Sequence, residues 1–133
     1  PSSAASDVYK RQMYGIPNAE KKPYNISGEF LEGNSIQGKI IEFPLLVTKF
    51  LGKKIPAGGG FYLRTLPLRV IKNAIKSYQE ENIPGVFYIH SWELTPEFMP
   101  KISLPVKDNF ITYHNLNKAL PKMTEIIQNF EFT

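Results

Sequence analysis

A helix followed by a strand in the middle of the chain constrains the fold more than any other feature. The helix is predicted by apolar side chains at helical spacing, namely Leu68, Val70, Ile71, Ala74, Ile75 and Tyr78. We expect Thr65 to cap this helix and Pro84 to prevent it from continuing beyond about Asn82. A Pro-Gly turn then leads into the apolar stretch Val86–His90, which predicts a buried strand. A helix that leads into a strand is typical of α/β folds.

Loops, turns and short extended segments are predicted before this unit. Residues 13–38 are rich in glycine, proline and asparagine and predict loops. Residues 38–44 predict a strand that ends at Pro44, whereas residues 45–51 fit either a helical turn or an extended segment. The triple glycine Gly58–Gly60 lets the backbone approach another segment or a ligand closely. A tight turn into a packed helix is favoured over a ligand-contacting loop, and both interpretations are kept.

The C-terminal part of the chain predicts a second helix over residues 120–129, where Pro121 fits the first turn. Its apolar face is predicted to consist of Leu120, Met123, Ile127 and Phe130. Ahead of it we expect one short turn capped by Thr95 and a brief extended segment at residues 110–113. A short strand at residues 130–132 is expected to end the chain.

Length and composition indicate one ordinary globular domain. The chain has 133 residues, of which 42% are hydrophobic and 21% charged. Residues 1–12 are polar and without periodicity, and they resemble translated adaptor sequence or a disordered leader, so the domain is assigned to residues 13–133. The lack of cysteine excludes a disulfide framework and a cysteine nucleophile. No apolar run reaches the ~20 residues that a membrane-spanning helix needs, and the sequence does not indicate a compartment.

The basic charge does not indicate a nucleic-acid partner. The formal net charge is +4, but the densest basic points are the pairs Lys21-Lys22 and Lys53-Lys54. The arginines are scattered at Arg11, Arg64 and Arg69. Nucleic-acid binding commonly relies on lysines and arginines clustered on one face. We therefore expect no nucleic-acid partner.

His90, at the carboxyl end of the predicted strand, is the first candidate for chemistry. Polar side chains at such strand ends often face a cleft in α/β proteins. Two interpretations stay open for it: a buried histidine satisfied by the backbone, and a proton donor or acceptor. Ser91 is not expected to act with it as a nucleophile, because neighbouring residues of a strand point to opposite faces. The period of two places Trp92 on the same side as His90, where core packing is the simplest role.

A complete metal site is not expected within the chain. It has two histidines, His90 and His114, no H-x-x-H or H-x-x-x-H pair and no cysteine. Hydrolytic zinc sites commonly take three protein ligands held close together. The sequence therefore predicts no metal ligands here.

Several motifs occur in an order that resembles one known family. The run Gly58-Gly-Gly-Phe-Tyr-Leu-Arg64-Thr-Leu-Pro67 precedes the predicted helix, and Val86-Phe-Tyr-Ile-His90-Ser-Trp92-Glu93 follows it. With Tyr14-Gly-Ile-Pro17, Glu42-Phe-Pro44 and residues 113–132, they resemble the C-terminal part of polysaccharide deacetylases, in the subfamily tied to exopolysaccharide and PEP-CTERM loci. The resemblance covers about residues 13–132.

The resemblance implies a C-terminal fragment of a distorted (β/α) barrel, with two helices and a few short strands. It implies part of a metal-dependent amide hydrolase that removes acetyl groups from N-acetylated polysaccharides or oligosaccharides. In that family a divalent metal, expected to be zinc, and an aspartate base activate water. Their motifs lie N-terminal to the elements seen here. The fragment alone is therefore expected to bind no metal and to be inactive.

Residue by residue, the resemblance maps the histidine that protonates the leaving amine onto His90. Phe87 and Ile89 stand at the apolar positions before it, and Trp92 and Arg64 are further candidates for the substrate pocket. The family assigns no role to Arg64 that carries over, and a structural ion pair is favoured for it.

Some positions depart from the family pattern, and another function class remains open. Ser91 stands where proline is usual, and Met13 stands where arginine is usual. Glu42, like Arg64, is a charged motif residue for which a structural ion pair is favoured. The alternative function is a non-catalytic carbohydrate-binding or accessory module, whose aromatic residues, 13% of the chain, would serve as platforms for sugars.

Overall fold

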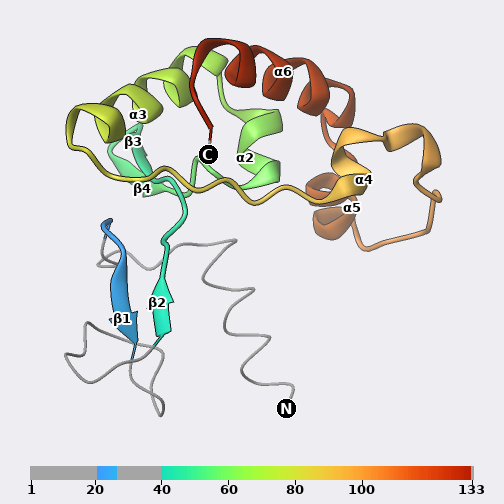
Figure 1. Ribbon diagram of the computed structural model, residues 1–133. Coiled ribbons are helices and arrows are strands. Elements are labelled where there is room, and N and C mark those ends of the chain that lie inside the picture. The colour runs from blue at the N-terminus through green and yellow to red at the C-terminus, as the bar shows by residue number, and fades with distance from the viewer. Residues whose placement is uncertain (1–20, 27–39, 133) are drawn as a thin grey trace.

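The computed structural model describes residues 21–26 and 40–132 and is a mixed α/β structure (Figure 1). Its elements are β1 (Tyr24–Ile26), β2 (Ile40–Glu42), β3 (Thr48–Phe50), β4 (Lys53–Ile55), α2 (Gly60–Thr65), α3 (Leu68–Glu80), α4 (Ser91–Leu94), η1 (Pro96–Phe98), α5 (Val106–Tyr113), η2 (Leu116–Lys118) and α6 (Ala119–Asn129). The strands form two antiparallel pairs, β1 with β2 and β3 with β4, and the described residues do not close into a barrel. The predicted leader, residues 1–12, and the motif Tyr14–Pro17 lie outside the described residues.

The predicted strand Val86–His90 is an extended segment that pairs through single parallel bridges. Val86 bridges to Leu45 and Tyr88 bridges to Gly59. The backbone N–H of Tyr88 donates to the carbonyl of Gly58 at 2.8 Å, and Gly60 N–H donates to the carbonyl of Tyr88 at 3.0 Å. Of the two predictions for residues 45–51, a helical turn or an extended segment, the extended one is correct. Leu45 bridges to Val86, and strand β3 follows at Thr48–Phe50.

The triple glycine forms the tight turn into a packed helix that the sequence favours. A Cβ on Gly58 would overlap the carbonyl oxygen of Val86. Only a residue without a side chain allows this close approach of two backbones. Gly59 and Gly60 then open α2, which is a helix separate from α3, whereas the sequence predicts a single helix after the turn.

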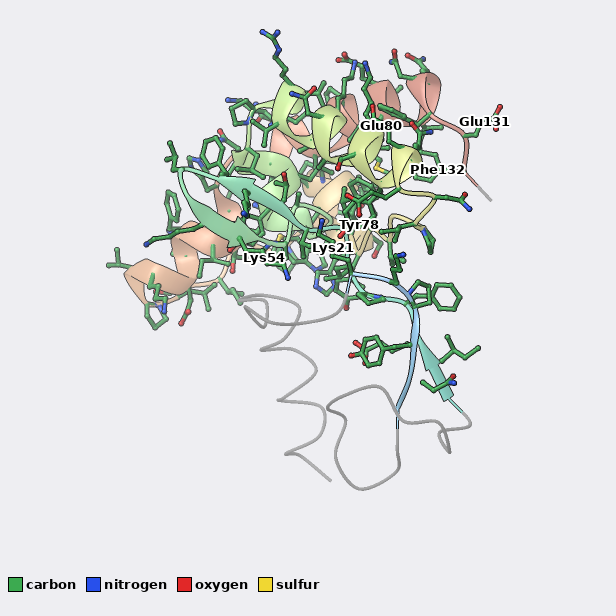
Figure 2. The ribbon with its side chains drawn as sticks, turned by 90° about the vertical axis from the view of Figure 1, so that its left-hand side faces the viewer. Lys21, Lys54, Tyr78, Glu80, Glu131 and Phe132 are labelled. Atoms are coloured by element: carbon green, nitrogen blue, oxygen red, sulfur yellow. The ribbon has the colours of Figure 1, made fainter. Side chains whose placement is uncertain are left out.

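Helix α3 confirms the clearest prediction from the sequence. It begins at Leu68 after Pro67, and its buried residues include Ile71, Ala74, Ile75 and Tyr78. Asn82 closes it in the left-handed region, with φ of 53°. The Tyr78 hydroxyl accepts a hydrogen bond from Val47 N–H at 3.1 Å, and Lys21 lies beside the ring (Figure 2). Burial raises the pKa of Tyr78.

The expected cap at Thr65 is wrong, because the preceding glycines start a helix of their own. Thr65 is the last residue of α2, and its hydroxyl donates to the carbonyl of Phe61 at 2.8 Å. The break between α2 and α3 falls at Leu66 and Pro67. Strand β2 confirms the strand predicted at residues 38–44, whereas β1 lies in a region for which only loops are predicted.

Two extended segments predicted near the C-terminus are wrong. Residues 110–113 are the last turn of α5, whose final carbonyls receive hydrogen bonds from the distant Arg64. Residues 130–132 are extended at Phe130 but pair with no other described strand. The turn after Thr95 is confirmed as η1, although the Thr95 hydroxyl donates back to Ser91 and does not cap it.

Helix α6 is confirmed, and two of the four residues predicted for its apolar face, Met123 and Phe130, pack against the core. The other two, Leu120 and Ile127, are 52% and 54% exposed, and Ala119 and Ile126 are buried in their place. The Lys122 ammonium donates to carbonyls at the end of α2, at 2.9 Å from Leu63 and 2.6 Å from Leu66. Desolvation by burial lowers the pKa of Lys122.

Figure 1 shows α3 and α6 together on one side of the extended segment. Among the described helices, none combines the length and apolar character needed to cross a bilayer.

Candidate functional site

A pocket of about 90 Å³ lies where the triple glycine, the extended segment and α4 meet. It is lined by Gly59, Gly60, Phe61, Tyr62, Arg64, Tyr88, His90, Trp92, Glu93, Ile111 and Thr112. Since one water molecule takes up ~30 Å³ in the liquid, this volume suits a few waters or a small substituent of a larger ligand. Aromatic side chains form much of its wall, and its imidazole, basic and acidic groups come from His90, Arg64 and Glu93.

His90 lies at the junction between the extended segment and α4, where it is the N-cap residue. Its half-buried ring stacks on Trp92, with centroids 5.3 Å apart and 15° between the planes. The ring of Tyr88 meets it edge-on at 4.9 Å. The backbone N–H of His90 donates to Glu93 Oε2 at 3.1 Å. The imidazole is thus oriented by two neighbouring rings and by its own backbone.

A buried ion pair forms the floor below this histidine. Arg64 and Glu93 are each only 2% exposed, and Arg64 Nη2 lies 2.9 Å from Glu93 Oε1. A carboxylate this deeply buried needs such a partner, because an unpaired buried charge is very costly. A Cβ on Gly60 would overlap the Glu93 carboxylate, so the last glycine of the triple makes room for the pair.

The same guanidinium closes the end of α5. Arg64 Nη1 donates to the carbonyl of His114 at 2.7 Å, and Nη2 donates to that of Ile111 at 2.9 Å. Helices leave their last carbonyls unpaired, and Arg64 satisfies those of α5 from another part of the chain. Burial lowers the pKa of Arg64, and its attraction to Glu93 opposes that effect. Arg64 Nε is buried with no hydrogen-bond partner in the described part of the chain.

One protein family accounts for almost the whole chain. The model of a domain of unknown function, DUF3473, matches residues 2–133. The chain belongs to this family. No curated protein and no solved structure matches it. The motifs described above are therefore features of a DUF3473 domain, and a link from this domain to the deacetylases rests on the resemblance of its motifs.

The DUF3473 domain brings together three of the predicted site residues. His90, Trp92 and Arg64 line one pocket. Phe87 and Ile89 do not line it, because residues of an extended segment alternate, and these two pack against the hydrophobic core. Trp92 follows the segment and belongs to α4, yet it stacks on His90 as the same-side prediction implies.

Other residues of the pocket were not selected from the sequence. Tyr88 and Phe61 contribute aromatic walls, and Gly60 and Glu93 form its floor. Two signals could have indicated the floor. Glu93 stands three residues after the N-cap, the position of the acid in a capping box, and a triple glycine commonly marks close packing.

The predicted ion pair is present for Arg64, with Glu93 as its partner. Glu42 lies opposite Tyr24 in the β1–β2 pair, and no ion pair joins it to another residue of 21–26 or 40–132. No three His, Asp or Glu side chains within those ranges are grouped so that they could hold a metal ion. The described residues by themselves therefore do not fit the divalent metal that the family resemblance implies.

Proposed function

We propose that this DUF3473 domain contributes to the active site of a metal-dependent polysaccharide deacetylase, an amide hydrolase acting on N-acetylated sugars. The observation that carries the proposal is the placement of His90 in the pocket wall, oriented by Tyr88, Trp92 and its own backbone. The order of motifs along the chain supports it, because His90 stands where the family has its proton-donating histidine.

In this proposal His90 moves a proton and the aromatic residues hold the sugar. An imidazole changes charge near neutral pH, so it can give a proton to the amine that leaves when an acetamide is hydrolysed. A pocket of about 90 Å³ suits a small group such as an acetamide substituent. Tyr88 is 41% exposed and offers its ring to the apolar face of a sugar.

The remaining machinery is proposed to come from outside the residues described. Because no metal cluster exists within them, no step of the proposal at this domain runs through a metal. We also propose that the parallel bridges from Leu45 to Val86 and from Gly59 to Tyr88 belong to a distorted (β/α) barrel in the intact protein. The domain alone is then inactive.

The test is acetate release from oligomers of N-acetylglucosamine by a native protein that carries both this domain and the upstream metal motifs. Replacing a general acid commonly costs about 10²–10⁴ in rate, so His90→Ala should lower kcat by that factor and leave metal content unchanged. His114→Ala is the matched control, since the His114 ring stacks on Phe110 and lies outside the pocket lining. Undiminished turnover in His90→Ala would remove His90 from the mechanism.

The domain by itself allows a second test. Zinc titration of the isolated chain should give no tight stoichiometric binding, since the ligands are proposed to lie elsewhere. Tight binding of one zinc per chain would contradict that part of the proposal.

A non-catalytic carbohydrate-binding role is the second candidate, and the exposed ring of Tyr88, in the same pocket as Trp92, favours it. Binding of the isolated domain to a glycan array, lost in Trp92→Ala and retained in His90→Gln, would support it. Failure of the isolated domain to bind any glycan would count against it.

A further inference from the structure

The β3–β4 hairpin (Thr48–Ile55) ends in an exposed apolar turn. Phe50 pairs with Lys53, so the loop between them has two residues, Leu51 and Gly52. Both have positive φ, at 49° and 78°. Such turns favour Asn followed by Gly, because a bulky side chain is strained at positive φ. Leu51 is nevertheless 87% exposed. Folding of the hairpin therefore gains nothing from this side chain.

The hairpin also carries three lysines close to its turn. Lys49 and Lys54 lie directly opposite each other in the antiparallel register. Lys53 is exposed next to the turn, and residues 48–55 contain no acidic side chain. Figure 2 shows Lys54 on this hairpin, on the side of the molecule away from Phe132. An exposed leucine is thus surrounded by basic residues of one short element.

We propose that the hairpin docks on an anionic lipid surface, with Leu51 entering the headgroup region and the exposed Lys49 and Lys53 facing anionic headgroups. An apolar side chain ringed by lysines is complementary to such an interface, where apolar burial and charge attraction act together. A nucleic acid would instead favour arginines and aromatic rings that stack on bases, and the tip of the hairpin is aliphatic. Figure 1 shows the hairpin and helices α4 and α5 at opposite ends of the molecule, so docking leaves the pocket accessible.

The test is co-sedimentation of the full chain with vesicles of phosphatidylcholine alone or with added phosphatidylglycerol. Wild type should bind the anionic vesicles, bind the neutral ones much more weakly, and lose binding as salt rises. Leu51→Asn should weaken binding about tenfold or more through the lost apolar burial. Its thermal midpoint should stay equal or rise, because Asn suits positive φ. Each lysine near the surface contributes about a fivefold factor, so Lys49→Gln with Lys53→Gln should cost roughly 25-fold.

Matched controls separate the hairpin from general surface properties. Val106→Ser removes an apolar side chain that is 89% exposed on α5, and Lys76→Gln removes an exposed charge on α3. Both should bind like wild type. Equal binding to neutral and anionic vesicles, wild-type binding by Leu51→Asn, or an equal loss in Val106→Ser would overturn the proposal. Dimerisation that disappears in Leu51→Asn, without vesicle binding, would assign the tip to a second copy and also overturn it.

Discussion

Removing the charge of Glu93 while keeping its shape should destabilise the domain strongly. Glu93→Gln leaves the guanidinium of Arg64 buried, at 2% exposure, without its carboxylate. Breaking a buried ion pair by neutralising one partner commonly costs 3–5 kcal/mol. The carbonyls of α5 continue to accept from Arg64, so the lower end applies, and we expect about 3 kcal/mol. For a domain of this size that corresponds to a fall in Tm of roughly 10 °C.

The assay is urea and thermal unfolding followed by circular dichroism, with Glu125→Gln as the control. Glu125 pairs with Lys72 at the surface, where its side chain is 51% exposed. Exposed pairs contribute about 0–1 kcal/mol, so this variant should unfold close to wild type. If Glu93→Gln also unfolds within about 1 kcal/mol of wild type, the buried pair does not hold α2, α4 and α5 together.

Two further variants test the packing around this pair and the core. Gly60→Ala should lower the free energy of unfolding about as much as Glu93→Gln, since its Cβ must displace the Glu93 carboxylate. The control Gly85→Ala should be tolerated, because a Cβ there meets its neighbours at ordinary contact distances. Equal unfolding midpoints for these two variants would contradict the close packing at Gly60. Tyr78→Phe should cost about 1 kcal/mol at neutral pH, since Val47 N–H loses its acceptor. Because burial raises the pKa of Tyr78 above its ordinary value of 10.0, the unfolded state ionises first and wild type loses stability as pH rises past that value. Urea titrations at neutral pH and above pH ~10 should show a smaller alkaline loss in Tyr78→Phe, and an equal loss would refute the assignment.

Local patterns were sufficient to predict the elements that local forces stabilise. Helix α3 has one apolar stripe facing the core and a clear C-terminal signal at Asn82, and its predicted apolar face and end agree with the structure, although the cap predicted at Thr65 does not. Residues 110–113 contain several aromatic and β-branched side chains and therefore predict an extended segment. They form the end of a helix whose last carbonyls receive hydrogen bonds from the guanidinium of Arg64, which is far away in the sequence. No window of the sequence contains both partners of that interaction.

The residues of the candidate site that lie in one continuous motif could be predicted from the sequence, and the contacts between motifs could not. The motif around His90 and Trp92 is continuous in sequence, and both residues reach the pocket. Phe87 and Ile89 belong to the same motif, but alternation turns them to the core, and the sequence alone does not show which face of the segment is buried. The pairing of Arg64 with Glu93 joins two motifs, and it depends on the tertiary approach of α2 and α4.

Arg64 and His90, which both line the pocket, therefore differ in what their loss would mean. Arg64 lines the pocket, but its terminal nitrogens are engaged by Glu93 and by the end of α5. It reaches His90 indirectly, through Glu93, whose second oxygen accepts from the His90 backbone, and through Trp92, whose ring lies below the guanidinium at 5.9 Å and stacks on His90. A substitution of Arg64 should then lower activity and stability together, whereas His90→Ala should lower activity and leave stability nearly unchanged. Measuring unfolding beside turnover therefore distinguishes His90, the proposed proton donor, from Arg64, a residue that supports the structure around it.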